Sequence, residues 1–193
     1  MRHFIASIVF CLTSLFVYHG FVSMPKPEPI ETVQHMAASF VWKYNSDENS
    51  ICTASYIGSG LFLTAGHCIV DDQLGSLVNS SDEQVIVEAT YKDSESDLGL
   101  LFTSRQGDGL KVFDIPAVDR QLYAIGIPGS LGDDLVIAPV RVSLFSMLNN
   151  SYYANSIGSD IWPGMSGGPL IDSEGNIYGV ISYTRAYSHG NMT

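Results

Sequence analysis

The stretch that decides the fold of this chain is Trp162–Leu170, which reads WPGMSGGPL. Three glycines and two prolines surround one serine, Ser166, with apolar residues on both sides. Glycine adopts positive φ and lets other atoms approach the backbone, whereas proline fixes φ, so this stretch suits neither a helix interior nor a central strand. We therefore predict a rigid loop that holds one hydroxyl group. Serine alone is a weak nucleophile, and it needs a base and an oxyanion site beside it.

Two further stretches supply partners for this serine. The apolar run Leu61–Ala65 leads directly into Gly66, His67 and Cys68, and Asp97 precedes a second apolar run, Leu98–Phe102. A histidine can accept the proton of a serine, and a carboxylate can orient the histidine. The order histidine, aspartate, serine differs from the orders found in subtilisins and in α/β-hydrolases.

These three stretches resemble the motifs of the trypsin-like (chymotrypsin-fold) serine peptidases, which read Thr-Ala-X-His-Cys, Asp-Leu/Ile-Ala-Leu-Leu and Gly-X-Ser-Gly-Gly-Pro. The resemblance implies a catalytic triad in which His67 is the general base, Asp97 orients it and Ser166 is the nucleophile. It also implies an oxyanion hole formed by the backbone N–H groups of Gly164 and Ser166. The reaction would be hydrolysis of peptide bonds through an acyl-enzyme. Asp82 and Asp93 are the alternatives to Asp97.

The same resemblance identifies two candidate substrate-binding residues. Asp160 stands six residues before Ser166, where trypsin-like enzymes have the residue at the base of the specificity pocket, and an aspartate there selects arginine or lysine. HtrA-like relatives with a similar loop take small aliphatic residues instead, so both preferences stay open. Ser182 is the second candidate, and it also matches a family serine that supports the catalytic aspartate.

Met165 stands immediately before the candidate nucleophile. Members of the family that are activated by cleavage have an aspartate there, which pairs with the new N-terminus. The sequence therefore resembles the bacterial and viral branch, including HtrA-like enzymes, that needs no such cut. The implied fold is all-β, with two six-stranded antiparallel β-barrels and the active site in the cleft between them. Short strands separated by glycine-rich turns independently favour barrels or a sandwich.

The 193 residues divide into five expected segments. Residues 4–23 are apolar after a basic start, so we expect a signal peptide or membrane anchor over 1–23, and retention would attach the chain to a membrane. Three prolines predict an extended tether over 24–36. The first barrel is expected over 37–104, a linker over 105–119 and the second barrel over 120–193. An export signal places the domain outside the cytoplasm.

The cysteines also indicate whether the domain lies inside or outside the cytoplasm. Cys11 lies in the apolar N-terminal run, which leaves Cys52 and Cys68, and an even remainder suggests one disulfide in an exported chain. The resemblance implies that these two residues pair and secure the loop that carries His67. Two buried free thiols are the alternative for a cytosolic protein.

Composition limits the function classes. The chain is 46% hydrophobic and 15% charged, with a net charge of −11, which is typical of a globular protein and unlike a nucleic-acid-binding one. The expected partner is a protein or peptide substrate, and nothing in the sequence predicts a cofactor or a metal site. An α/β-hydrolase esterase is disfavoured, because the residues after Ser166 cannot readily start the helix that its elbow needs. A catalytically silent binding module with the peptidase fold remains the alternative function.

Overall fold

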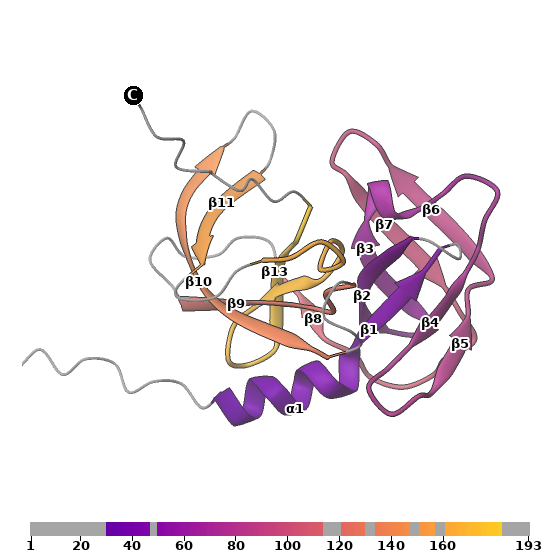
Figure 1. The fold of residues 1–193 in the computed structure, drawn as a ribbon, viewed down its shortest axis with the longest axis horizontal. Coiled ribbons are helices and arrows are strands. Elements are labelled where there is room, and N and C mark those ends of the chain that lie inside the picture. The colour runs from indigo at the N-terminus through magenta and orange to yellow at the C-terminus, as the bar shows by residue number, and fades with distance from the viewer. Residues whose placement is uncertain are drawn as a thin grey trace, which may run out of the picture.

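The computed structural model describes residues 30–46, 50–113, 121–129, 134–146, 151–156 and 161–182. In these ranges the chain forms one α-helix, one short 3₁₀ turn and two β-sheets, and the sheets lie side by side (Figure 1). This is the all-β, two-barrel architecture that the motifs predict. The strands of each sheet curl around their own apolar core. Hydrogen bonds from Thr53 to Ser166 and from Ser182 to Asp97 join the two halves at the motif loops.

The first sheet has seven strands in the order β5-β4-β1-β2-β3-β7-β6. Its strands are β1 (Val41–Asn45), β2 (Ile51–Gly58), β3 (Leu61–Ala65), β4 (Ser76–Val78), β5 (Gln84–Ile86), β6 (Ala89–Asp93) and β7 (Leu98–Phe102). The edge strands β5 and β6 are separated along the chain only by Val87 and Glu88. They are therefore two halves of one bent strand, which closes the sheet into a barrel.

The bend in this strand explains why the count is seven and not the expected six. Val87 is fully buried, and its N–H donates to Gly75 O at 3.3 Å on one side of the barrel. Glu88 N–H donates to Phe102 O at 2.7 Å on the other side. The strand thus pairs with β4 before Val87 and with β7 after Glu88. An alternating pattern of residues in the sequence does not reveal this change of partner.

The second sheet has six strands in the order β11-β10-β9-β12-β13-β8. Its strands are β8 (Lys111–Val112), β9 (Gln121–Gly126), β10 (Val136–Ser146), β11 (Ser151–Ser156), β12 (Pro169–Ile171) and β13 (Asn176–Val180). All neighbours are antiparallel except β8, which pairs in parallel with β13. The short strand β8 falls in the segment expected to be a linker. Leu110, just before it, is buried in the core beneath β13, which fixes this segment to the second sheet.

The helix α1 (Ile30–Phe40) corrects one expectation: residues 30–36 are helical and not part of an extended tether. Pro29 is the last proline before the helix. A proline just before a helix, or in its first turn, does not disrupt it, because the N–H that proline lacks would have no partner within the helix there. Val33 and Ala37 lie one turn apart on the same face and are both fully buried. They pack with residues of β9, β12 and β13, so α1 covers the second sheet (Figure 1).

Some expectations fall outside the described residues, namely the apolar run 4–23, the prolines before residue 30, and Asp160. Within the described ranges, no helix combines the length and the apolarity that crossing a membrane requires.

Candidate active site

His67 lies at the end of β3, on the 3₁₀ turn η1 (Gly66–Cys68). β3 and β7 are paired so that Ala65 stands opposite Leu98, which brings the ends of the two strands together. A further hydrogen bond joins these two ends, because the Gly66 N–H donates to Asp97 O at 2.8 Å. The antiparallel register therefore puts His67 and Asp97 at the same edge of the first barrel.

Asp97 bonds to His67 through both of its carboxylate oxygens. Oδ1 accepts the backbone N–H of His67 at 2.8 Å, and Oδ2 lies 2.9 Å from His67 Nδ1. Asp97 has φ of 51°, in the left-handed region that aspartate tolerates better than most side chains. Ser182 Oγ donates a further hydrogen bond to Asp97 Oδ2 at 2.5 Å. Ser182 thus contacts the aspartate from the second half of the chain.

The charge state of Asp97 follows from these contacts. Burial by itself raises the pKa of a carboxyl group, but the hydrogen bonds from Ser182 and His67 outweigh burial and hold the pKa of Asp97 below its usual range. Asp97 is therefore ionised at neutral pH. An ionised carboxylate only accepts hydrogen bonds, so His67 carries a proton on Nδ1, and in the neutral form of the ring the lone pair then lies on Nε2.

The two alternative aspartates, Asp82 and Asp93, make other hydrogen bonds. Asp93 Oδ1 accepts the backbone N–H of Glu95 at 3.0 Å, and its Oδ2 accepts Ser96 Oγ at 2.6 Å. Asp93 therefore caps the turn that leads to Asp97. Asp82 lies in the turn before β5, where its N–H donates to Asn79 O. Neither carboxylate has a hydrogen bond to His67 among the described residues.

Ser166 lies in the loop between Trp162 and Gly168, which is fixed mainly through its backbone. Met165 N–H donates to Trp162 O at 3.1 Å, and the Met165 side chain is fully buried in the core of the second barrel. Gly167 has φ of +86°, and a Cβ atom there would lie 2.1 Å from Thr53 O. Only glycine fits this position, because any side chain would clash with the backbone of β2.

The loop brings Ser166 next to the turn of His67. Ser166 O accepts the N–H of Thr53 at 2.7 Å and lies 3.7 Å from Cys68 Sγ. Among the described residues, no hydrogen bond joins the hydroxyl of Ser166 to His67. Nucleophile and base are often further apart in an enzyme without substrate than in its complexes. The structure thus joins His67, Asp97 and Ser182 by hydrogen bonds, and it puts the backbone of Ser166 beside them.

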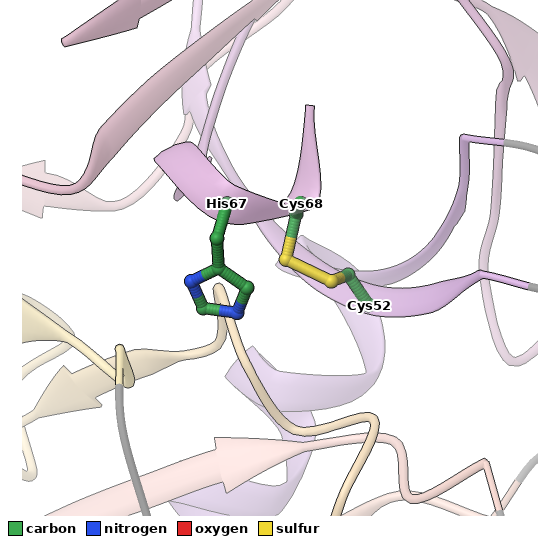
Figure 2. A group of neighbouring side chains, drawn as sticks. All are labelled: Cys52, His67 and Cys68. Carbon is green, nitrogen blue, oxygen red and sulfur yellow. A yellow bond between two sulfur atoms is a disulfide. The ribbon is translucent and has the colours of Figure 1, made fainter. Parts of the chain in front are cut away.

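The sulfur atoms of Cys52 and Cys68 lie at bonding distance, with their Cα atoms 6.1 Å apart. Figure 2 shows His67 and Cys68 projecting from the same short turn, with Cys52 reaching Cys68 from β2. Potential ligand atoms of these three residues all lie within 4.8 Å of one another. Sulfur atoms bonded to each other offer no thiolate, and His67 Nδ1 is engaged by Asp97, so this group lacks the donors of a zinc site.

Sequence reasoning missed one residue of this region. Thr53 is fully buried on β2 and bonds to the loop of Ser166 from across the molecule. Threonine is common in strands, so no sequence signal singles it out.

A family model described as a trypsin-like peptidase domain matches residues 52–180. Among curated proteins, the chloroplastic protease Do-like 2 of Arabidopsis thaliana is 24% identical over 154 residues, and the match covers 74% of this chain and 25% of that protein. The chain thus spans about a quarter of the length of this relative. The Do-like relative agrees with the resemblance to the HtrA-like branch.

Two solved structures have a similar fold. The inactive form of the Rv3671c protease of M. tuberculosis superposes with a TM-score of 0.63 at 21% identity, over 82% of this chain and 85% of that one. A serine endoprotease from Yersinia pestis gives a TM-score of 0.62 at 20% identity, over 81% and 57%. These likenesses show a shared fold, and the family match covers more than half of the sequence. This chain belongs to the family of trypsin-like peptidase domains.

Proposed function

We propose that this chain is a serine endopeptidase that hydrolyses peptide bonds through His67, Asp97 and Ser166. The observation that carries the proposal is the pair of hydrogen bonds that Asp97 accepts, one from the backbone N–H of His67 and one from its ring. Such an arrangement orients the imidazole and stabilises the imidazolium that forms when histidine takes a proton. Membership of the peptidase family supports a protease with proteins or peptides as substrates.

The backbone of the Ser166 loop supports an oxyanion hole at Gly164. Pro163 O accepts the N–H of Gly129 at 3.1 Å, which fixes the peptide plane between Pro163 and Gly164. In a trans peptide the C=O and N–H bonds point in opposite directions, so the Gly164 N–H is directed away from Gly129. Among the described residues it has no acceptor, which leaves it available to a substrate oxygen.

The N–H of Ser166 is in the same situation. Met165 O accepts the N–H of Gly168 at 3.0 Å, so the peptide plane between Met165 and Ser166 is also fixed. Within the described part of the chain, the Ser166 N–H donates to no protein acceptor. Two fixed N–H groups flanking one residue suit the negative oxygen that develops during acyl transfer.

In the proposed reaction Ser166 Oγ attacks the carbonyl carbon of the scissile bond while His67 Nε2 takes the hydroxyl proton. The carbonyl oxygen becomes an oxyanion that accepts hydrogen bonds from Gly164 and Ser166. His67 then gives its proton to the leaving amine, and the acyl-enzyme forms. A water molecule, deprotonated by His67, hydrolyses the ester and restores Ser166.

Side-chain preference stays open between basic and small aliphatic residues. Trp162, at the start of the loop, is 39% exposed and is a candidate wall of the substrate pocket. Cleavage of a positional peptide library by the wild type and by Asp160→Ala decides between the two preferences. Enrichment of arginine or lysine that disappears in the variant supports selection by Asp160, and its absence in the wild type rules that out.

Covalent labelling by a fluorophosphonate probe tests the proposed function. The wild type should be labelled at Ser166 and should cleave peptides, whereas Ser166→Ala and His67→Ala should lose both activities. Ser104→Ala is the matched control, because Ser104 is an exposed serine outside the site, and it should label normally. A folded wild type that is neither labelled nor active would favour the silent binding module.

A further inference from the structure

Thr53 joins the two halves of the molecule beneath the Ser166 loop. It belongs to β2 of the first sheet and is fully buried. Its hydroxyl donates to Gly164 O at 2.9 Å and accepts the N–H of Ile127 at 2.9 Å. Its own N–H donates to Ser166 O at 2.7 Å. One residue of the first barrel therefore binds two separate segments of the second.

The hydroxyl of Thr53 restrains the peptide planes on both sides of Gly164. It holds the plane that follows Gly164 directly, through the carbonyl oxygen of that residue. It supports the preceding plane indirectly, through the segment 127–129. The Thr53 hydroxyl anchors Ile127 at one end of this segment, and Gly129 at the other end donates its N–H to Pro163 O. The direction of the Gly164 N–H depends on this preceding plane.

Gly164 needs such support because its conformation is unusual. Its φ is +100°, and a Cβ atom there would lie only 2.3 Å from Gly129 N. The two segments that Thr53 binds are thus in close backbone contact at this glycine. Without the hydroxyl, the buried Ile127 N–H and the half-buried Gly164 O would each lose this partner, and the segments would shift to recover one.

We propose that Thr53 is a positioning residue that aims the Gly164 N–H at the oxyanion formed during attack by Ser166. The proposal rests on the proposed peptidase function. Oxyanion donors accelerate a reaction only when they are fixed before the charge develops, so a small rotation of this peptide weakens transition-state binding more than substrate binding.

Three single variants of the full chain test this role. Thr53→Val keeps the shape of the side chain and removes the hydroxyl, whereas Thr53→Ser keeps the hydroxyl. Tyr56→Phe is the matched control, because Tyr56 is a buried residue of the same strand whose hydroxyl donates to Gly107 O at 3.1 Å, in the connection that follows the first sheet. For each variant, kcat, KM, the rate of fluorophosphonate labelling and the melting temperature are measured.

Thr53→Val should lower kcat by about 10- to 100-fold, since complete loss of one oxyanion donor lowers it by about 10²–10³-fold. Its KM and the acid limb of its pH profile should stay near the wild-type values, because substrate binding and the contacts between His67 and Asp97 are intact. A peptide boronate, which forms a tetrahedral adduct with an active serine, should bind more weakly by a similar factor. Thr53→Ser should stay within about threefold of the wild type, and Tyr56→Phe should lose stability without losing kcat.

Several results would overturn the role of Thr53. A Thr53→Val enzyme with wild-type kcat would do so, as would a loss of kcat no larger than that of Tyr56→Phe at equal loss of stability. If Thr53→Val does not fold by circular dichroism, Thr53→Ala takes its place under the same criteria. A wild type that neither labels nor cleaves overturns the peptidase function and this role with it, whereas an active wild type isolates the role of Thr53.

Discussion

Asp97 holds His67 at two points, the backbone N–H through Oδ1 at 2.8 Å and the ring nitrogen Nδ1 through Oδ2 at 2.9 Å. One carboxylate therefore sets both where the histidine sits and how its ring is turned. Because the pKa of Asp97 is held below its usual range, the carboxylate stays an acceptor across the neutral pH range and holds a proton on Nδ1, which in the neutral ring puts the lone pair on Nε2.

Replacement of Asp97 by asparagine removes the negative charge of this side chain and nearly preserves its shape, so it tests what the charge contributes to catalysis. In Asp97→Asn an amide N–H can face Nδ1, which forces the ring proton onto Nε2, where it blocks proton transfer from Ser166. We expect kcat to fall by about 10³- to 10⁴-fold with little change in KM. Asp93→Asn is the matched control, because Asp93 caps a neighbouring turn, and it should keep kcat near the wild-type value. If the two variants lose kcat equally, Asp97 has no special role.

Ser182 has two candidate roles, and one variant distinguishes them. Its hydroxyl donates to Asp97 Oδ2 at 2.5 Å, so Ser182→Ala should raise the pKa of Asp97 and loosen the carboxylate. We expect kcat to fall about tenfold, the size of one hydrogen bond to a charged group, and Ser182→Thr to restore most of it. A raised KM with unchanged kcat would instead indicate a substrate-binding residue.

The sequence predicts those features of the site that depend on residues close together in the chain. An apolar strand that ends at His67 and another that begins after Asp97 predict that these residues lie at strand ends. The pairing of β12 with β13 is equally local, because these two strands follow each other directly along the chain. The register that sets Ala65 opposite Leu98 then brings the two strand ends together.

The parts that the sequence does not predict depend on distant contacts. Residues 30–36 become helical because Val33 and Ala37 find apolar partners on the second sheet, which no local pattern specifies. β8 forms because Leu110 is buried beneath β13. The link between Thr53 and Gly164 spans 111 positions along the chain, and it follows only from the meeting of the two barrels.

The pairing of Cys52 with Cys68 is a prediction that solution chemistry can test. Non-reducing peptide mass mapping of exported protein should find the two residues linked, in keeping with a domain outside the cytoplasm. The two cysteines are 16 positions apart, and a disulfide that closes a loop of this size stabilises by about 3 kcal/mol. A Cys52→Ala, Cys68→Ala double variant should therefore unfold at a clearly lower urea concentration. Two free thiols in exported protein would contradict the pairing.

Asp172 should make the stability of the second barrel depend on pH. This buried residue caps the turn between β12 and β13: its Oδ1 accepts the N–H groups of Glu174 and Asn176 at 2.9 and 3.0 Å, and its Oδ2 accepts the Tyr178 hydroxyl at 3.0 Å. Burial alone raises the pKa of Asp172, but these bonds and those from the Asn176 side chain outweigh it and lower the pKa below its usual value.

A carboxyl group with a lowered pKa in the folded state stabilises the fold at any pH above its pKa in the unfolded chain, about 3.9. That stabilisation is lost as the pH falls through the lower, folded-state value. Asp172→Asn should thus lower the free energy of unfolding by about 1–2 kcal/mol at pH 7, since an amide nitrogen cannot accept the bonds made to Oδ2. The difference from the wild type should shrink in urea titrations near pH 3, where the wild-type carboxyl also begins to take up its proton. Asp71→Asn, at an exposed position, should show no such difference at either pH. A gap between Asp172→Asn and the wild type that is equal at both pH values would mean that the charge of Asp172 contributes nothing and that only the shape of its side chain matters.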